Sequence, residues 1–365
     1  MSGTRIMSSQ YIEWAKLRAG ARYNLATSGV KNVTLAELGA TLDDMEISGA
    51  STYGYAPLQA ALAQKCGVAP ECVVAGAGTS GANHLAMAAL LSPGDEVLIE
   101  HPAYDPMLGL ALHLGARVKR FARRAENGFG VDTGELEHLI SCDTRMIVLT
   151  NLHNPSGALL DGAALRRIGE IARSVGARVL VDEVYLEMLA VQDTPAPVRS
   201  AYLLGPEFVV TSSLTKAYGL SGLRCGWILA EPDLAQRMWR LNDLFANIPA
   251  HPAERLSVVA LERLDRIAAR SRALLATNRA LLDQFLAARD DLQVVCPPCG
   301  TIVFPRLPFD SQKFCERLRE KYETSVVPGR FFEMPQHIRI GIGGDTAEVA
   351  EGLTRLGACF DEFRR

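Results

Sequence analysis

The stretch FVVTSSLTKAYGLSGLRCGWILA, residues 208–230, places two apolar runs around a short segment of small and polar residues. Both runs are apolar on both faces, which is typical of strands in a buried sheet. Between them lies one lysine, Lys216, with Ser213 three residues before it and Arg224 eight residues after it. A lysine at a strand end, among glycines and hydroxyl residues, indicates the ligand-bearing edge of such a sheet.

Similar apolar runs precede this stretch and alternate with helical patterns. The predicted strands are EVLIE (96–100), RMIVLT (145–150) and RVLVDEVY (178–185). The segments ANHLAMAALL and GAALRRIGEIARSVG repeat apolar residues at helical spacing. This alternation predicts an α/β fold with a doubly wound, mainly parallel sheet, whose ligands bind beyond the carboxyl ends of the strands.

The pattern changes near residue 265, where one long helical segment begins. Short strands, the run HIRIGIG and a final helix follow it, which together favour a smaller α+β unit. We therefore expect a large domain over 46–265 and a small C-terminal domain over 266–365. The first residues, 1–45, lack the βαβ pattern and are expected to pack on the small domain and the substrate site.

The composition excludes several classes of function. The 365 residues carry a formal net charge of −3, which argues against nucleic acid and against a charged membrane surface as partners. No run is long and apolar enough to span a membrane, and no apolar signal segment begins the sequence. A cytoplasmic location is the resulting prediction.

The eight cysteines are scattered and, in a chain of this length, do not resemble a disulfide framework. Cys296 and Cys299 have the spacing of a redox or metal site. The apolar runs on either side of them favour a strand–turn–strand instead, and a zinc site needs more ligands nearby. No metal is predicted.

Lys216 by itself is compatible with an ordinary surface lysine on a loop. Ser213 and Arg224 change this interpretation, because a hydroxyl and a guanidinium both bind anions. A lysine beside an anion site, desolvated by small neighbours, is a candidate imine-forming nucleophile.

Two other segments point to the same chemistry. GAGTSGANHLAMAAL places Gly78, Thr79 and Ser80 at a helix start, where free N–H groups cradle phosphate, although such residues also serve as simple caps. VLVDEVY places Asp182 at the end of a buried strand, with Tyr185 three residues later. A carboxylate there needs a cationic or donor partner, and its structural alternative is a helix cap or a core ion pair.

In spacing and order, SSLTKAYGLSGLRCGW, NLHNPSG and VDEVY resemble the motifs of the class I/II aminotransferases of fold type I, which use pyridoxal phosphate (PLP). The resemblance extends from about Asn24 to Arg339. It implies a PLP-binding large domain of fold type I, a homodimer, and an amino acid and a 2-oxo acid as substrates.

The resemblance also assigns roles to individual residues. The catalytic residues would be Lys216, which forms the aldimine with PLP and then acts as the base, Asp182, which pairs with the pyridine nitrogen, and Tyr185, which faces the phenolic oxygen of the ring. The expected cofactor-binding residues are Gly78, Thr79, Ser80, Tyr104, Asn154, Asp182, Tyr185, Ser213, Lys216 and Arg224. The expected substrate-binding residues are Arg339, Asn154 and Gly29.

Within this set, Tyr104 is similar to the aromatic residue that stacks on the ring, and Asn154 to the asparagine that donates to the phenolic oxygen. Arg339 corresponds to the arginine that clamps the substrate α-carboxylate, for which a guanidinium is suited. RYNLATSGV resembles the N-terminal substrate loop, with Ser28 or Gly29 near that carboxylate.

The sequence departs from the family pattern at two places. Gly49 stands where many members carry a tyrosine that reaches the second subunit, and either Tyr53 or Tyr55 could replace that contact, or it could be absent. Asn242 stands where dicarboxylate-specific members carry an extra arginine, although Arg240 lies close by. An unpaired second carboxylate would be costly to bury, so an apolar or aromatic amino donor is predicted.

The predicted function is ping-pong transamination between an amino acid and a 2-oxo acid. The alternatives are a PLP-dependent β-lyase, or other chemistry at Cα such as racemisation, and a non-catalytic regulator that retains the fold. A regulator is disfavoured because the lysine is present and no DNA-binding segment is evident. A cis bond before Pro155 is also predicted, because tight functional turns favour it.

Overall fold

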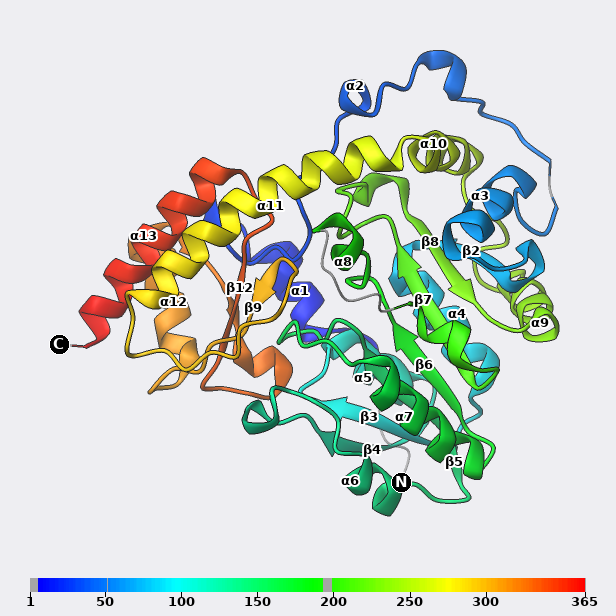
Figure 1. The fold of residues 1–365 in the computed structure, drawn as a ribbon, viewed down its shortest axis with the longest axis horizontal. Coiled ribbons are helices and arrows are strands. Elements are labelled where there is room, and N and C mark those ends of the chain that lie inside the picture. Colours follow the sequence, from blue (N-terminus) through cyan, green and yellow to red (C-terminus); the bar gives the residue numbers. More distant parts are fainter. Residues whose placement is uncertain (1–5, 51, 193–198, 365) are drawn as a thin grey trace.

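The computed structural model describes residues 6–50, 52–192 and 199–364. Its centre is a seven-stranded sheet with the order β2-β8-β7-β6-β5-β3-β4 (Figure 1). The five strands from β7 to β4 run parallel, whereas β8 is antiparallel to both β2 and β7. The predicted α/β fold with a mainly parallel sheet is confirmed. The strands are β2 (Val73–Ala77), β3 (Glu96–His101), β4 (Arg117–Ala122), β5 (Thr144–Thr150), β6 (Arg178–Asp182), β7 (Phe208–Ser213) and β8 (Cys225–Leu229).

Helices separate these strands along the chain and continue into the C-terminal part. They are α1 (Gln10–Leu17), α2 (Leu35–Leu38), α3 (Ala56–Cys66), α4 (Gly78–Leu90), α5 (Asp105–His113), α6 (Thr133–Leu139), α7 (Gly162–Ser174), α8 (Glu187–Val191), α9 (Pro232–Asn242), α10 (His251–Glu262), α11 (Leu264–Ala287), α12 (Ser311–Tyr322) and α13 (Thr346–Phe363).

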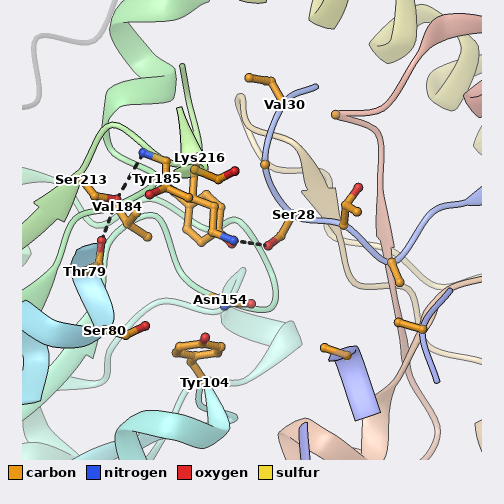
Figure 2. Close-up of a pocket in the computed structure, with 18 of the residues that line it drawn as sticks. Ser28, Val30, Thr79, Ser80, Tyr104, Asn154, Val184, Tyr185, Ser213 and Lys216 are labelled. Carbon is orange, nitrogen blue, oxygen red and sulfur yellow. Dashed lines mark hydrogen bonds between the residues drawn. The ribbon is translucent and has the colours of Figure 1, made fainter. Parts of the chain in front are cut away.

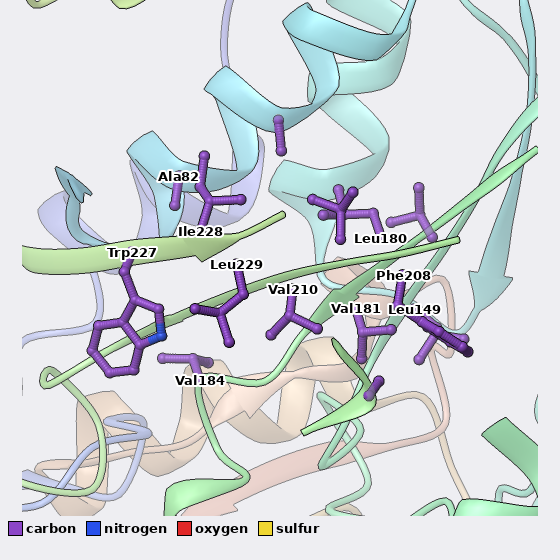
Figure 3. Packing of buried hydrophobic residues seen from close by; sticks show 14 of the residues in the cluster. Ala82, Leu149, Leu180, Val181, Val184, Phe208, Val210, Trp227, Ile228 and Leu229 are labelled. Atoms are coloured by element: carbon purple, nitrogen blue, oxygen red, sulfur yellow. The ribbon is translucent and has the colours of Figure 1, made fainter. Parts of the chain in front are cut away.

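The core of the sheet consists of alternating side chains on both faces. On β8, Ile228 points toward Ala82 of α4, whereas Trp227 and Leu229 point to the opposite face (Figure 3). All four side chains are buried, with at most 1% of each exposed. A strand that is apolar on both faces needs cover on both, which is the arrangement predicted from the sequence.

Three strand predictions need correction. The strands β2 and β4 were not expected; β4 lies at the sheet edge and carries three basic residues, which hides its strand pattern. The strand predicted over 178–185 ends at Asp182. It ends there because the Asp182 carboxylate accepts a hydrogen bond from the Val184 N–H at 3.0 Å, which closes a turn.

Two glycines allow the backbone to cross closely at the cavity edge of the sheet. A Cβ added to Gly226 of β8 would lie 2.3 Å from the carbonyl carbon of Gly78. The Gly78 N–H donates to the Arg224 carbonyl at 2.7 Å, so the start of α4 is held against the turn that enters β8. This contact brings the positive end of α4 beside Arg224.

The C-terminal part has its own core between the long helix α11, helices α12 and α13, and short strands (Figure 1). Its small antiparallel sheet has the order β11-β12-β9, and β10 pairs with β1 near the N-terminus. The strands are β1 (Tyr23–Asn24), β9 (Ile302–Val303), β10 (Thr324–Ser325), β11 (Val327–Pro328) and β12 (Ile338–Gly341). The division of the chain at 45/46 and 265/266 stays a prediction; the second point falls at the start of α11.

We predict that Gly226→Ala lowers the free energy of unfolding by about 3 kcal/mol, because the added methyl group would overlap backbone that cannot move away. The measurement is the free energy of chemical unfolding. Gly222→Ala is the matched control, because a Cβ there meets nothing within 4 Å. Equal stability of the two variants would contradict the role given to the crossing.

Candidate active site

A cavity of about 620 Å³ opens beside the carboxyl ends of β5, β6 and β7 (Figure 2). The N-terminal segment, the large sheet and the loop that follows β12 all contribute to its walls. Ten of the predicted site residues line it: Gly29, Thr79, Ser80, Tyr104, Asn154, Asp182, Tyr185, Ser213, Lys216 and Arg224. Gly78 and Arg339 do not line it, and each lies directly behind a residue that does.

One end of the cavity is built to hold an anion. Thr79 and Ser80 lie at the start of α4, where backbone N–H groups lack helical partners. The Thr79 hydroxyl donates to Ser213 Oγ at 2.9 Å, and the Arg224 guanidinium lies beside Gly78. Hydroxyl groups, a guanidinium and the positive end of a helix together favour a phosphate-like group.

A second feature of the cavity is the buried carboxylate of Asp182. Asp182 Oδ2 accepts from Asn83 Nδ2 at 2.8 Å, and no described cation lies within ion-pair distance of it. Burial raises the pKa of Asp182 to about 6, against the hydrogen bonds from Asn83 and the Val184 N–H and the charge of Lys216. The carboxylate therefore favours a cationic or N–H donor partner in the cavity.

Asn83 is a site residue that the sequence analysis missed. It lies on the buried face of α4, and its side-chain oxygen accepts from the Thr211 hydroxyl of β7. A polar residue on the buried face of the helical run ANHLAMAALL was the available signal.

Lys216 lies between these two ends of the cavity. Its Nζ donates to Ser28 Oγ at 3.1 Å (Figure 2). Burial lowers the pKa of Lys216, and the nearby charges of Arg339 and Arg224 lower it further, whereas Tyr11 and Asp182 act against them. A lysine with a lowered pKa is a better nucleophile and base near neutral pH.

The loop that contains Ser28 packs directly on the lysine. The Val30 N–H donates to the Lys216 carbonyl at 2.9 Å, and a Cβ on Gly29 would lie 3.4 Å from Lys216 Cα. Ser28 also bonds the hydroxyl of Tyr185, whose pKa burial raises, while Arg339 and Ser28 lower it. The N-terminal segment thus lines the cavity and packs against Lys216.

Arg339 forms the third charged feature and is buried behind the wall of the cavity. Its Nη1 donates to Asn154 Oδ1 at 2.9 Å, and its Nη2 donates to the Tyr11 hydroxyl at 2.8 Å and to the Ala26 carbonyl at 3.1 Å. Its Nε is buried and has no partner among the described residues. Because a buried guanidinium needs acceptors, a carboxylate in the cavity would be a suitable ligand.

Tyr11 of α1 is the second residue that the sequence analysis missed. Its ring is in edge contact with that of Tyr104, at 5.8 Å between centroids, and its hydroxyl accepts a hydrogen bond from Arg339. Ser9 caps α1 and bonds Asp105 at the start of α5, which holds the helix over the cavity. Nothing local in SSQYIEW indicated this long-range contact.

Several other residues considered in the sequence analysis lie outside the cavity. Asn242 does not line the cavity, because its side chain donates to the Asn247 carbonyl at 2.8 Å near the end of α9. Neither Tyr53 nor Tyr55 lines it. Cys296 and Cys299 are free thiols, and among the described residues no group of His, Cys, Asp and Glu is arranged to hold a metal ion.

The predicted cis bond before Pro155 is wrong. In the described residues the cis bonds are His101–Pro102 and Asn151–Leu152. The Asn154 N–H donates to Thr150 Oγ1 at 3.0 Å, and this hydrogen bond, with the trans bond after it, already directs Asn154 into the cavity.

Within the described part of the chain, no helix is both long and apolar enough to cross a membrane.

Comparison with known proteins agrees with this arrangement. Residues 14–356 match the model of the family "Aminotransferase class I and II". Capreomycidine synthase of Streptomyces vinaceus is 32% identical over 92% of this chain and 89% of its own, and arginine–pyruvate transaminase AruH of Pseudomonas aeruginosa is 29% identical over 80% and 76%. The chain therefore belongs to the class I and II aminotransferase family.

Solved structures agree on the fold. A PLP-dependent aminotransferase from Streptococcus suis superposes with a TM-score of 0.92 at 26% identity, covering 99% of this chain and 100% of that one. The PLP-dependent cyclase OrfR superposes with a TM-score of 0.89 at 24% identity, covering 100% of both chains. The fold is that of fold type I, and the family is PLP-dependent.

The residues of this chain fit that cofactor. The cavity offers an anion-binding end at Thr79, Ser213 and Arg224, a buried carboxylate at Asp182 and a partly buried lysine between them. Tyr104 supplies an aromatic wall, and burial raises its pKa well above the usual value, so the ring stays neutral.

We predict that Asp182→Asn stabilises the cofactor-free protein at pH 8. A pKa of about 6, against an ordinary value of 3.8, means that the folded protein binds this proton more tightly than the unfolded chain. Asp182 therefore contributes most to stability below about pH 4, and this contribution is lost as the pH rises through 6. The difference corresponds to about 3 kcal/mol.

Chemical unfolding of the wild type and the variant at pH 4 and pH 8 measures this effect. The advantage of the variant should appear at pH 8 and vanish at pH 4. Asp345→Asn is the control of opposite sign, because the hydrogen bond to Lys31 lowers the pKa of Asp345. If Asp182→Asn did not raise the free energy of unfolding at pH 8, the raised pKa of Asp182 would be contradicted.

Proposed function

We propose that the protein is a PLP-dependent aminotransferase that exchanges an amino group between an amino acid and a 2-oxo acid. The single observation that carries this proposal is Lys216, a partly buried lysine of lowered pKa, set between an anion-binding end, a buried acid and a buried arginine. Bound PLP supplies an electron sink that stabilises negative charge at the substrate Cα. The proposal concerns what the side chains of this chain contribute to that chemistry.

The first contribution is to hold the cofactor by both ends. Thr79, Ser80, Ser213 and Arg224, with the N–H groups at the start of α4, would bind its phosphate. Asp182, fixed by Asn83, would hold a proton at the pyridine nitrogen, because a buried carboxylate gains stability from a cation beside it.

The second contribution is to orient the substrate. The Arg339 guanidinium, with the amide of Asn154, would bind the α-carboxylate in a fixed direction. Tyr185 would hold its hydroxyl toward the cofactor ring, where Ser28 bonds it. These contacts decide which bond at Cα is presented for reaction.

The third contribution is proton transfer. Lys216 Nζ would carry the proton from the substrate Cα to the cofactor carbon C4′, because its lowered pKa leaves a fraction unprotonated near neutral pH. Ser28 Oγ, 3.1 Å from Nζ, would hold the amine in place between these two positions.

The substrate side chain is proposed to be apolar or aromatic. The wall of the cavity at α1 presents Ile12, Trp14 and Ala15. The lining also contains Lys31, but its ammonium is paired with Asp345 at 2.9 Å and is half exposed. A second carboxylate would therefore lack a free cation among the described residues of this wall.

A second function is supported by one relative. The 32% identity to capreomycidine synthase over most of both chains favours a synthase that uses the same PLP fold for different chemistry at the substrate carbons. Arg339, Asp182 and Lys216 would have the same roles in either reaction. The two functions differ in whether an acceptor 2-oxo acid is consumed.

The protein is further proposed to be a homodimer. Large apolar side chains are exposed on the segment before α3 and after α9: Leu42, Met45, Ile47, Tyr53, Leu244 and Phe245. Exposed apolar surface of this kind marks interaction sites, and covering it with a second copy would remove it from water. A cytoplasmic location stays part of the proposal.

We predict that the purified protein transfers amino groups to pyruvate or 2-oxoglutarate. With one common acceptor, kcat/KM for phenylalanine or leucine should exceed that for aspartate at least about tenfold, because burying an unpaired carboxylate costs more than 1.4 kcal/mol. Arginine belongs in the same series because one relative is an arginine–pyruvate transaminase. The new amino acid and the 2-oxo acid product are measured by chromatography.

Ammonia release without an acceptor is measured in parallel. Turnover of the donor with no acceptor present would support the lyase or synthase alternative over transamination. Aspartate as the best donor would contradict the predicted substrate class. Lys216→Ala is the control, since it should lose turnover under every condition.

A further inference from the structure

A buried ion pair lies below the floor of the cavity and has no part in the roles proposed so far. Glu100 is in β3, and Arg123 directly follows β4. Arg123 Nη1 lies 2.7 Å from Glu100 Oε2, and the two side chains are 0% and 2% exposed. Burying two charges costs more than a surface pair, so the remaining hydrogen bonds of the carboxylate matter.

The other carboxylate oxygen holds the last residue of β5. Glu100 Oε1 accepts from the Thr150 N–H at 2.8 Å and from the Thr150 hydroxyl at 2.7 Å. An ionised carboxylate can only accept, so the Thr150 hydroxyl must donate to it. This leaves the lone pairs of Thr150 Oγ1 for another donor, and the Asn154 N–H occupies that place at 3.0 Å.

Arg123 holds the same residue from a second direction. Its Nη1 also donates to the Thr150 carbonyl at 3.2 Å, and its Nε donates to the Phe129 carbonyl at 2.6 Å. Both backbone groups and the hydroxyl of Thr150 are therefore bonded to the ion pair. Such a fully bonded buried residue has little freedom to rotate.

The series of hydrogen bonds continues to the substrate side of the site. Asn154 Oδ1 accepts from Arg339 Nη1, so the NH₂ group of Asn154 is left for a ligand in the cavity (Figure 2). The path from the ion pair thus runs through Thr150 to Asn154 and Arg339. No step in it exceeds 3.0 Å.

We infer that Glu100 is a positioning residue, which acts through the Thr150 hydroxyl to hold Asn154 and Arg339 in the orientation that binds a substrate carboxylate. This inference rests on the proposed function, because it assigns the carboxylate to Asn154 and Arg339. Burial raises the pKa of Glu100, and the charge and hydrogen bond of Arg123 act against that effect.

Strands β3, β4 and β5 also contain a matched control. At the amino end of β3, Glu96 Oε1 accepts from the Thr144 hydroxyl at 2.6 Å, and Lys119 Nζ lies 2.9 Å from Glu96 Oε2. This triad repeats the acid, threonine and cation but lies at the end of the strands away from the cavity. Substitutions there test for effects of lost stability alone.

The first experiment compares Thr150→Val with Thr150→Ser in the holoenzyme. The probe is 2-methylalanine, which has an α-carboxylate but no Cα hydrogen, and its Kd is read from the visible absorption of the cofactor. Loss of the Thr150 hydroxyl should raise Kd about tenfold, because its buried hydrogen bonds with Glu100 and with the Asn154 N–H are both lost. Thr150→Ser should stay within about threefold, and Thr144→Val should not change Kd.

The second experiment is a double-mutant cycle of Glu100→Gln and Thr150→Val on the same Kd. If Glu100 acts through the hydroxyl, Glu100→Gln should raise Kd about fivefold in the wild type but less than about twofold in the Thr150→Val background. Glu96→Gln is the control. Additive effects would overturn the inference.

A third measurement does not depend on cofactor chemistry. In the cofactor-free protein, the backbone N–H of Asn154 should exchange its hydrogen at least about tenfold faster in the Thr150→Val variant than in the wild type. The exchange should also be faster in the Glu100→Gln variant, although Glu100 does not contact Asn154. Unchanged exchange in Thr150→Val would overturn the inference even if Glu100→Gln failed to fold. A wild type that bound no PLP would count against the proposed function, whereas exchange would still decide the inference.

Discussion

The burial of charged side chains around one cavity is the constraint on which the rest of the structure depends. A charge removed from water must regain hydrogen bonds or an opposite charge, or the fold loses several kcal/mol. Asp182 accepts a hydrogen bond from Asn83 of α4, and Arg339 donates hydrogen bonds to Tyr11 of α1 and to Asn154 of the loop after β5. Each partner comes from a different element, so satisfying a few charges fixes the relative position of several elements.

The same constraint explains why three distant parts of the chain complete the site. The sheet supplies the lysine and the acid, the C-terminal part supplies the arginine, and the N-terminal segment covers both. Ser28 contacts both Lys216 and Tyr185, and Tyr11 contacts Arg339. The packing of these parts around Lys216 desolvates its amine, which is the largest cause of its lowered pKa.

Much of the large sheet was predictable because its strands are apolar on both faces and its helices are regularly periodic. Ten of the predicted site residues line the cavity, and eight of these end or follow a strand, or begin a helix, at the sheet edge where ligands bind; the exceptions are Gly29 and Arg224. Asn83, Tyr11 and Glu100 were missed because their partners are distant along the chain. Tyr11 and Arg339 are separated by 328 residues, and no local pattern reports such a hydrogen bond.

The sequence by itself determined five of the seven strands of the large sheet, its mainly parallel character and the position of Lys216 near its carboxyl edge. These properties follow from local periodicity, because the side-chain period of a strand or helix is set by backbone geometry. Only the tertiary structure decided that Asp182 meets Asn83 without an ion-pair partner, that Asn154 enters the cavity after a trans bond to Pro155, and that Glu100 lies beneath it. Those outcomes depend on which buried polar groups meet across elements, and a hydrogen bond over such distances exists only once the packing has brought its two atoms within about 3 Å.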